Sequence, residues 1–391
     1  FCFRAQKGVV RREVFGYNRT DNLGTKGVMQ KMKATLILEN GMTFAGRSIG
    51  SGEERICEMV FNTSMTGYQE ILTDPSYAGQ GIVMSYPLIG NYGVNGADNE
   101  SARPWAEAFV VRHLARRGSN FRCEGDLDTY LKKHDITGIQ SVDTRALTKI
   151  LRSQGSMNGM LTCAEHFNVA EVMERLRSYE VKDTVRKVTR TEPEVFDAYG
   201  EETHRVAVMD YGVKQNIIEC LRRRGCKVVA LPAYTPASEV LSGGFDGVML
   251  SNGPGDPVEN TEIIAELRKL YDSTIPIFGV CMGHQLLALA TGAKTGRLAY
   301  GHRGGNHPVR DLEKNRVFIT SQNHGYMVLS DTVDPAVAEV SHINVNDGTC
   351  EGLKYKRPNC FTTQFHPEAN AGPKDTEYLF NRFIESMGGA K

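Results

Sequence analysis

Apolar runs bounded by turn residues mark the start of the regularly patterned chain. Residues 34–39 form the first such run and predict a strand. Asn-Gly at 40–41 favours a tight hairpin turn, and residues 42–46 form a second run that predicts the returning strand. The pattern therefore indicates an antiparallel pair of strands at the beginning of a domain.

A helical period follows later in the same region. Asp143 stands just before it, and an aspartate at this place accepts hydrogen bonds from the free N–H groups of a first helical turn. The apolar residues that recur on one side of the period are Leu147, Ile150 and Leu151. We predict a capped helix over residues 143–152 and a first α/β domain over residues 32–177.

The pattern changes near residue 205, where short and fully apolar runs begin to alternate with helical periods. The runs are 205–210, 227–231, 247–250 and 275–280, and the helical periods are 213–224, 260–271 and a third from residue 283. Short apolar strands separated by helices predict a mostly parallel sheet that is covered on both faces. Ligands of such sheets gather at the carboxyl ends of the strands, so we look for a site there in residues 205–391.

Two segments stand apart from these domains. Residues 178–204 are rich in charged side chains and poor in large aliphatic ones, which is typical of a linker. Residues 1–31 hold seven basic and two acidic side chains with scattered glycines. We interpret them as an extension outside the folded domains, disordered or artefactual, with Met32 as the biological start; a transit peptide is the alternative.

Composition narrows the class of protein. The 391 residues carry 46 basic and 46 acidic side chains, so the broad positive charge of a nucleic-acid binder is missing. No uninterrupted apolar run approaches the roughly 18 residues of a membrane-spanning helix. The nine cysteines are scattered without a Cys-x-x-Cys pair, which fits neither a disulfide framework nor a zinc site. We expect a cytoplasmic protein without a metal, a nucleic-acid partner or a membrane partner.

The sharpest chemical signal is Gly-Val-Cys-Met-Gly at 279–283, which follows directly on an apolar run. A cysteine flanked in this way at a turn from strand to helix has the arrangement of a nucleophile elbow, with sulfur in place of the serine oxygen. The start of the following helix would favour the thiolate form of Cys281. Most cysteines only fill space in a core, but the two glycines and the preceding strand indicate a nucleophile here.

A cysteine nucleophile needs a base, and His366 is the best placed of the ten histidines. His366 directly follows the apolar segment 361–365, and Glu368 comes two residues later, within reach of the second ring nitrogen of His366. Pro367 restricts the turn between them. We predict that His366 and Glu368 act together with Cys281.

The glycine-rich segment 250–257 is the candidate for an oxyanion hole. Glycine lets backbone N–H groups approach a substrate without a Cβ atom in the way. We predict a hole formed by the N–H groups of Gly253 and Met282, the residue after the nucleophile. No Gly-Lys-Ser/Thr follows, so the segment is not a phosphate loop and no nucleotide-binding loop is expected in this chain.

These motifs together resemble class I glutamine amidotransferases. They are Ser-Asn-Gly-Pro-Gly-Asp at 251–256, Gly-Val-Cys-Met-Gly-His-Gln at 279–285 and Phe-His-Pro-Glu at 365–368. The first domain is similar to the amino-terminal half of carbamoyl-phosphate synthase small subunits, and the segments that carry this likeness are 61–77, 86–93 and 140–145. Segments 301–309 and 321–325 of the second domain support the same resemblance. The resemblance runs from about Met32 to the carboxyl end and leaves out residues 1–31.

The resemblance implies a role for individual residues. Cys281 would be the nucleophile, His366 the general base and acid, and Glu368 the carboxylate that orients the histidine. The implied glutamine contacts are Ser76, Gly253, Gly255, Met282, Gln285, Asn323, Gly325 and Tyr326. Met282 and Tyr326 depart from the commonest pattern, which has leucine and phenylalanine there, but both provide mainly backbone or apolar surface. Because Ser76 belongs to the first domain, the pocket would lie between the domains.

The resemblance also implies a reaction and a partner. Glutamine would be hydrolysed to glutamate and ammonia through a glutamyl thioester. The ammonia would pass through an internal tunnel to a large subunit that makes carbamoyl phosphate from bicarbonate for pyrimidine and arginine biosynthesis. ATP and Mg²⁺ would be used on that subunit, so this chain needs no cofactor of its own.

Several alternatives stay open at this point. The chain could be the glutaminase component of an anthranilate or guanylate synthase, a cysteine hydrolase of the same fold, or a non-catalytic subunit. Ser76 could be an ordinary β-turn serine. His284 is better placed for a structural than a catalytic role, and His324 is a candidate to support the site from behind.

Overall fold

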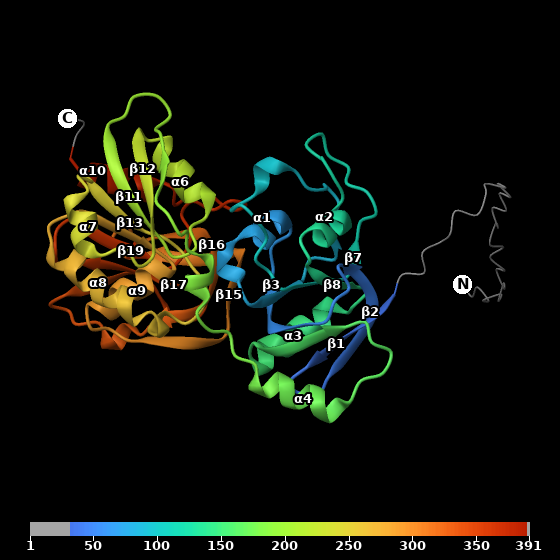
Figure 1. Ribbon diagram of the computed structural model, residues 1–391. Helices are drawn as coiled ribbons and strands as arrows, with labels where there is room; N and C mark the ends of the chain where they lie inside the picture. Colours follow the sequence, from blue (N-terminus) through green and yellow to red (C-terminus); the bar gives the residue numbers. More distant parts are fainter. Residues whose placement is uncertain (1–31, 389–391) are drawn as a thin grey trace, which may run out of the picture. The chain divides into compact units, whose positions relative to one another are not determined.

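The structure is a computed structural model that describes residues 32–388 (Figure 1). Two large sheets organise these residues, one a closed barrel and the other an open sheet of ten strands. We call residues 32–178 the barrel half and residues 184–388 the open-sheet half. The interpretation of residues 1–31 as an extension lies outside the described residues. The α/β fold class predicted from the sequence is confirmed.

Seven strands close the barrel in the order β1-β2-β8-β6-β4-β3-β9. Their bounds are β1 Lys33–Leu38, β2 Thr43–Gly50, β3 Arg55–Asn62, β4 Gln80–Met84, β6 Ala108–Val111, β8 Thr137–Gln140 and β9 Met157–Thr162. The predicted hairpin is confirmed: β1 and β2 are antiparallel, and the Leu38 N–H donates to the Met42 carbonyl at 2.9 Å. Successive side chains of a strand point to opposite faces of the sheet, so the neighbours Met59 and Val60 of β3 belong to two different apolar clusters.

Short helices cover the barrel. They are α1 Tyr68–Thr73, α2 Leu127–Lys133, α3 Thr144–Gln154 and α4 Val169–Ser178, with 3₁₀ turns η1 Pro75–Tyr77 and η2 Gly96–Asp98 and a small parallel pair of β5 Leu88–Ile89 and β7 His113–Leu114. The predicted helix is α3. Asp143 accepts a hydrogen bond from the Ala146 N–H at 3.0 Å, and Leu147 and Leu151 are fully buried.

Ten strands form the open sheet in the order β10-β12-β11-β13-β14-β19-β18-β17-β15-β16. Their bounds are β10 Glu194–Phe196, β11 His204–Asp210, β12 Cys226–Pro232, β13 Gly247–Leu250, β14 Ile277–Val280, β15 Thr295–Asp311, β16 Arg316–Val328, β17 Ala338–Asn344, β18 Cys350–Tyr355 and β19 Cys360–Thr363. The central strands from β12 to β19 run parallel, and antiparallel strands extend both sides. The predicted strands at 205–210, 227–231, 247–250 and 275–280 correspond to the parallel core.

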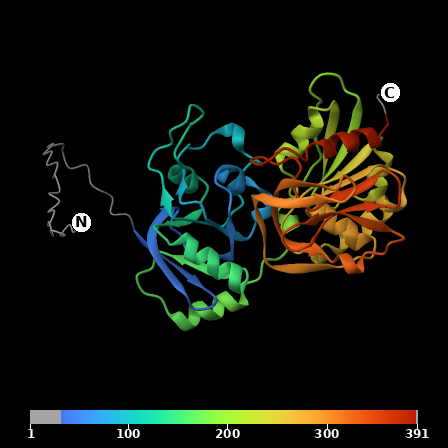
Figure 2. The ribbon, with the colours of Figure 1, turned by 180° about the vertical axis from the view of Figure 1, so that it is seen from behind.

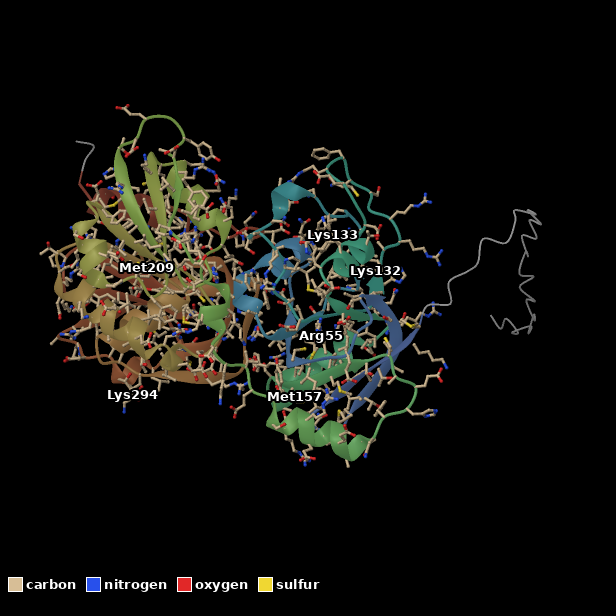
Figure 3. The ribbon with its side chains drawn as sticks, in the orientation of Figure 1. Arg55, Lys132, Lys133, Met157, Met209 and Lys294 are labelled. Carbon is tan, nitrogen blue, oxygen red and sulfur yellow. The ribbon has the colours of Figure 1, made fainter. Side chains whose placement is uncertain are left out.

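Helices cover both faces of the open sheet, as predicted. They are α5 Thr184–Val188, α6 Gln215–Arg222, α7 Ala237–Ser242, α8 Thr261–Asp272, α9 Met282–Ala290 and α10 Tyr378–Ser386, with 3₁₀ turns η3 Pro257–Glu259 and η4 Ser330–Thr332. One apolar layer packs α7, α8 and α9 on the sheet and contains Met209, which Figure 3 labels. The other packs α6 and α10, and Figure 2 brings α10 to the front.

The charged segment 178–204, which the sequence predicts to be a linker, is itself packed. Val185 of α5 is buried in an apolar cluster of the open-sheet half, and the Thr184 hydroxyl donates to the Pro254 carbonyl at 3.0 Å. β10 pairs antiparallel with β12 and so adds a strand to the open sheet. Within residues 32–388, none of the helices is both long and apolar enough to cross a bilayer.

Candidate active site

Cys281 is the single residue between strand β14 and helix α9. Its φ of 53° lies in the left-handed region, which a cysteine adopts only at a cost in strain. A Cβ atom on Gly283 would lie 2.4 Å from the Leu250 carbonyl oxygen, and one on Gly279 would lie 2.8 Å from the Thr362 methyl group. Both glycines of the motif are therefore required by close packing, and the turn has the geometry of a nucleophile elbow.

The glycine-rich loop after β13 lies directly against this elbow. The Gly283 N–H donates to the Ser251 carbonyl at 2.9 Å, which ties the start of α9 to the loop. A Cβ atom on Gly253 would lie 2.2 Å from the Tyr211 carbonyl oxygen, so only glycine fits there. Gly253 and Met282, the two residues predicted to form an oxyanion hole, border the same cavity as Cys281.

His366 and Glu368 lie at the end of the neighbouring strand. β14 and β19 are parallel with Val280 opposite Thr363, and the Cys281 N–H donates to the Thr363 carbonyl at 2.8 Å. The segments that follow the two strands therefore leave the sheet side by side. His366 Nδ1 lies 2.6 Å from Glu368 Oε1, whereas its Nε2 is buried without a hydrogen-bond partner. That free nitrogen can accept or return a proton.

Glu368 has a second partner that sequence reasoning missed. The Lys214 ammonium lies 2.7 Å from Glu368 Oε1, and both side chains are almost fully buried. Burial alone would raise the pKa of Glu368, but the charges of Lys214 and His366 outweigh it and lower that pKa to about 2. Glu368 is therefore a carboxylate at every physiological pH and can hold the ring of His366 in one tautomer.

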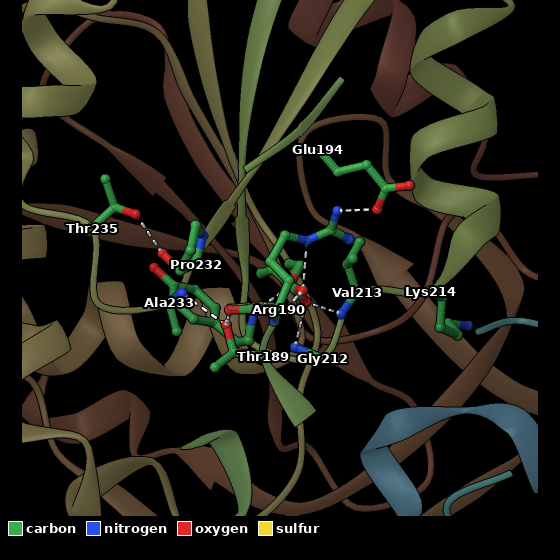
Figure 4. A network of polar contacts seen from close by, with 12 residues as sticks. Thr189, Arg190, Glu194, Gly212, Val213, Lys214, Pro232, Ala233 and Thr235 are labelled. Atoms are coloured by element: carbon green, nitrogen blue, oxygen red, sulfur yellow. Dashed lines mark hydrogen bonds and ion pairs between the residues drawn. The ribbon is translucent and has the colours of Figure 1, made fainter. Parts of the chain in front are cut away.

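The loop in front of Lys214 is fixed by Asp210 at the end of β11. One carboxylate oxygen accepts the N–H groups of Gly212 at 3.0 Å and Val213 at 2.8 Å. The other accepts the Arg190 Nε at 2.8 Å. Figure 4 shows Arg190, Gly212, Val213 and Lys214 in this network. Arg190 of the charged segment 178–204 thus helps to position the cation that pairs with Glu368.

A turn from the barrel half completes the site. Asp74 caps the 3₁₀ turn η1 and accepts the Ser76 N–H at 2.9 Å. The Ser76 hydroxyl accepts a hydrogen bond from Asn252 Nδ2 at 2.9 Å. Asn323 Nδ2 donates to the second oxygen of Asp74 at 3.1 Å. Ser76 is therefore more than a turn residue, because it contacts the glycine-rich loop of the other half.

One cavity of about 600 Å³ collects the residues predicted to bind a substrate. Its lining includes Cys281 together with Ser76, Gly253, Gly255, Met282, Gln285, Asn323, Gly325 and Tyr326. Gln285 is held in place because its Nε2 donates to the Tyr326 carbonyl at 2.8 Å and to Gln364 Oε1 at 3.0 Å. His366 and Asn323 border a second and much smaller cavity of about 30 Å³.

The protonation state of Cys281 differs from the sequence-based expectation. Burial raises the pKa of Cys281, and the nearby carboxylates of Asp74 and Glu368 raise it further. Lys214 and the Met282 N–H lower it, but they do not offset burial. The expectation that the helix start favours the thiolate is therefore wrong: the helix start is present, but burial outweighs it. The thiol has to lose its proton to a base as it reacts.

The remaining histidines have structural contacts. His284 is fully buried with Nδ1 at 2.7 Å from the Thr362 hydroxyl, and burial lowers its pKa to about 3. His324 Nδ1 donates to the Tyr326 carbonyl at 2.7 Å, which supports the strand that lines the cavity. Donor atoms of His302, His324 and Glu351 lie within 4.8 Å of one another, the spacing of a possible metal site. His302 Nε2 lies 2.9 Å from Asp347 Oδ2 and His302 Nδ1 lies 3.5 Å from Glu351 Oε1, and we assign the three residues no metal.

Comparison with known proteins gives consistent matches over both halves. Residues 36–161 match the family described as carbamoyl-phosphate synthase small chain, CPSase domain, and residues 207–386 match the class-I glutamine amidotransferases. A carbamoyl phosphate synthase small chain from Clostridium perfringens is 49% identical over 354 residues, which cover 90% of this chain and 99% of the relative.

Two further matches are more distant. A carbamoyl phosphate synthase pyrimidine-specific small chain from Bacillus subtilis is 45% identical over 357 residues, which cover 91% of this chain and 96% of the relative. A solved glutamine amidotransferase from Thermotoga maritima is 20% identical with a TM-score of 0.35 and covers 47% of this chain and 84% of that chain.

Proposed function

Because the chain belongs to the family of carbamoyl-phosphate synthase small chains and carries a class-I glutamine amidotransferase domain, we propose that it hydrolyses L-glutamine at Cys281 for a large-subunit partner. The observation that carries this proposal is that Cys281 and all the residues expected to contact glutamine border one cavity. The buried His366–Glu368 pair at the adjacent strand end supports it.

The first half of the reaction forms a thioester. His366 Nε2 takes the thiol proton of Cys281 as the sulfur attacks the side-chain amide carbon of glutamine. The amide oxygen becomes an oxyanion that accepts the N–H groups of Gly253 and Met282. The histidine then gives its proton to the amide nitrogen, and ammonia leaves as the carbon–nitrogen bond breaks. The product on the enzyme is a glutamyl thioester of Cys281.

The second half regenerates the thiol. His366 removes a proton from a water molecule, whose oxygen attacks the thioester carbonyl in the same oxyanion hole. The carbon–sulfur bond breaks, glutamate leaves and the proton returns to Cys281. Glu368 keeps the imidazole oriented and stabilises its charged form in both halves, and Lys214 keeps Glu368 ionised.

Ammonia requires a partner that uses it before it is lost. We propose that a large subunit receives it through an internal tunnel and makes carbamoyl phosphate from bicarbonate, with ATP and Mg²⁺ on that subunit. The small cavity beside His366 has room for one molecule the size of ammonia next to the proposed base. The pathways served would be pyrimidine and arginine biosynthesis, in a reducing cytoplasm, as the scattered cysteines of the sequence favour.

The decisive experiment uses the complex with a large subunit. Cys281→Ala should abolish carbamoyl phosphate formation from glutamine and leave formation from added ammonia unchanged, because only the first reaction needs the thiol. Cys226→Ala, which removes another buried thiol, is the matched control and should keep both activities. Mass spectrometry of glutamine-quenched wild-type enzyme should find a glutamyl adduct on the peptide with Cys281. Glutamine use by Cys281→Ala would refute the mechanism.

A further inference from the structure

Arg303 is a buried cation that the proposed reaction leaves without a task. It lies on β15 opposite Asn323 of β16, and only 4% of its surface is exposed. Among the described residues its guanidinium makes one hydrogen bond, from Nη1 to the Tyr300 carbonyl at 2.8 Å, and takes part in no ion pair. Its Nε is buried without a partner.

An unpaired buried charge is unusual for a physical reason. Moving a charge out of water is costly unless an opposite charge or several hydrogen bonds replace the lost hydration. The buried cation Lys214 obeys this rule, since it pairs with Glu368. Arg303 has four of its five N–H donors left over. These donors are available to an anion that enters from outside the chain.

The guanidinium lies in the wall of the large cavity. Arg303 borders that cavity together with Cys281, Ser76 and Gly325. A Cβ atom on Gly325 would lie 3.3 Å from Arg303 Nη2, and one on Gly301 would lie 2.2 Å from Nη1. The guanidinium thus reaches over two glycines, one of which is a predicted glutamine contact.

The substrate offers one anionic group. When the side-chain amide of glutamine reaches the thiol, the α-carboxylate must lie elsewhere in the same cavity, and a planar guanidinium with free N–H groups is the side chain best suited to bind it. We propose that Arg303 binds the α-carboxylate of glutamine and makes the pocket selective for amides that carry this group. The inference rests on the proposed glutaminase function. A purely structural role, in which Arg303 only holds the turn at Gly301, is the competing explanation.

Two analogues of glutamine separate these explanations. 4-Aminobutanamide lacks the α-carboxylate, and glutaramate lacks the α-amino group. The measurement is kcat/KM for amide hydrolysis by the complex of this chain with its large subunit, for glutamine and for each analogue. Hydrogen bonds to a charged group contribute about 1.5–3 kcal/mol, so Arg303→Met should lower the preference for glutamine over 4-aminobutanamide by about 10- to 100-fold. Its preference for glutamine over glutaramate should change by less than about threefold, since the lost interaction involves only the carboxylate.

Controls keep the test decisive. Arg297→Met removes a cation that lines the same cavity but is already paired with Glu58, and it should leave both preferences within about threefold of wild type. Carbamoyl phosphate formation from ammonia reports that each variant is folded and assembled. Arg303→Lys retains the charge without the paired N–H donors of a guanidinium, and its preference for glutamine over 4-aminobutanamide should fall between those of wild type and Arg303→Met. If the methionine variant does not assemble, the result for Arg303→Lys tests the proposal by itself.

The outcomes distinguish this inference from the function on which it rests. If wild-type protein does not hydrolyse glutamine at Cys281, the proposed function fails. If it does, and the Arg303 variants lose glutamine and 4-aminobutanamide activity in equal proportion, the residue is structural and the inference is wrong. A selective loss of the preference for the carboxylate supports it.

Discussion

The ion pair between Lys214 and Glu368 makes the most quantitative prediction. Lys214→Met removes the largest of the effects that keep the buried carboxylate ionised. Folding lowers the pKa of Glu368 from 4.5 to about 2. At about 1.36 kcal/mol for each pKa unit, that difference corresponds to ~3 kcal/mol. We expect Lys214→Met to lower the free energy of unfolding at pH 7 by about this amount, in line with the ~3–5 kcal/mol found when one partner of a buried pair is removed.

The sign of the pH dependence follows from the same shift. A carboxyl group whose pKa falls on folding adds stability above its unfolded value and loses it as the pH falls toward the folded value. The contribution of ionised Glu368 to the stability of the wild type should therefore be full at pH 7 and be lost between pH 4.5 and about 2, and Lys214→Met should lack most of this contribution. Glutamine hydrolysis should also fall, because a protonated Glu368 no longer stabilises a charged His366, whereas ammonia use should persist.

Urea unfolding of a double-mutant cycle tests this reasoning. The variants are Lys214→Met, Glu368→Gln and the double substitution, each compared with wild type at pH 7. The double variant should recover about 2 kcal/mol relative to the sum of the single changes, because no charge is then left buried alone. A loss below about 1 kcal/mol for Lys214→Met, or simple additivity in the cycle, would refute the assigned coupling.

Two further predictions concern the elbow. Gly283→Ala should lower the free energy of unfolding by ~2 kcal/mol or more, because the new methyl group would lie 2.4 Å from the Leu250 carbonyl oxygen. In the control Gly96→Ala the nearest outside atom would be 3.8 Å from the methyl group, so the free energy of unfolding should change by less than ~0.5 kcal/mol. Equal effects of the two substitutions on the thermal midpoint would contradict this prediction. The rate at which iodoacetamide inactivates the ligand-free protein should still rise with pH at pH 9, because burial raises the pKa of Cys281 above its ordinary 9.0; a plateau near pH 7 would show a resting thiolate.

Much of the fold could be predicted from local patterns. The hairpin at 40–41 and the helix capped by Asp143 depend on neighbouring residues, which the sequence displays directly. The parallel core of the open sheet follows from short apolar runs separated by helical periods. Closure of the first sheet into a barrel was not predicted, because pairing such as that of β2 with β8 joins residues far apart in the chain.

The candidate site was predicted in part for the same reason. Cys281 lies in a local motif in which strand, glycines and helix can be read together. Lys214 and Arg303 carry no such signal, since a lone basic residue in a sequence is most often at the surface. Both side chains are buried, Lys214 against Glu368 and Arg303 in the wall of the large cavity, and only the folded chain determines this placement. The raised pKa of Cys281 has the same origin, because the helix start is visible in the sequence but the desolvation that outweighs it is not.

The hydrogen bonds from Asn252 and Asn323 to the Asp74–Ser76 turn have a consequence for protein engineering. The open-sheet half cannot be exchanged independently of the barrel half, because the turn at residues 74–76 of the barrel half forms part of the pocket. A chimera that joins this barrel to the amidotransferase portion of another enzyme would need asparagines, or equivalent donors, at both positions to receive the turn. Recombination at the boundary therefore has to preserve this small set of long-range contacts as well as the catalytic residues.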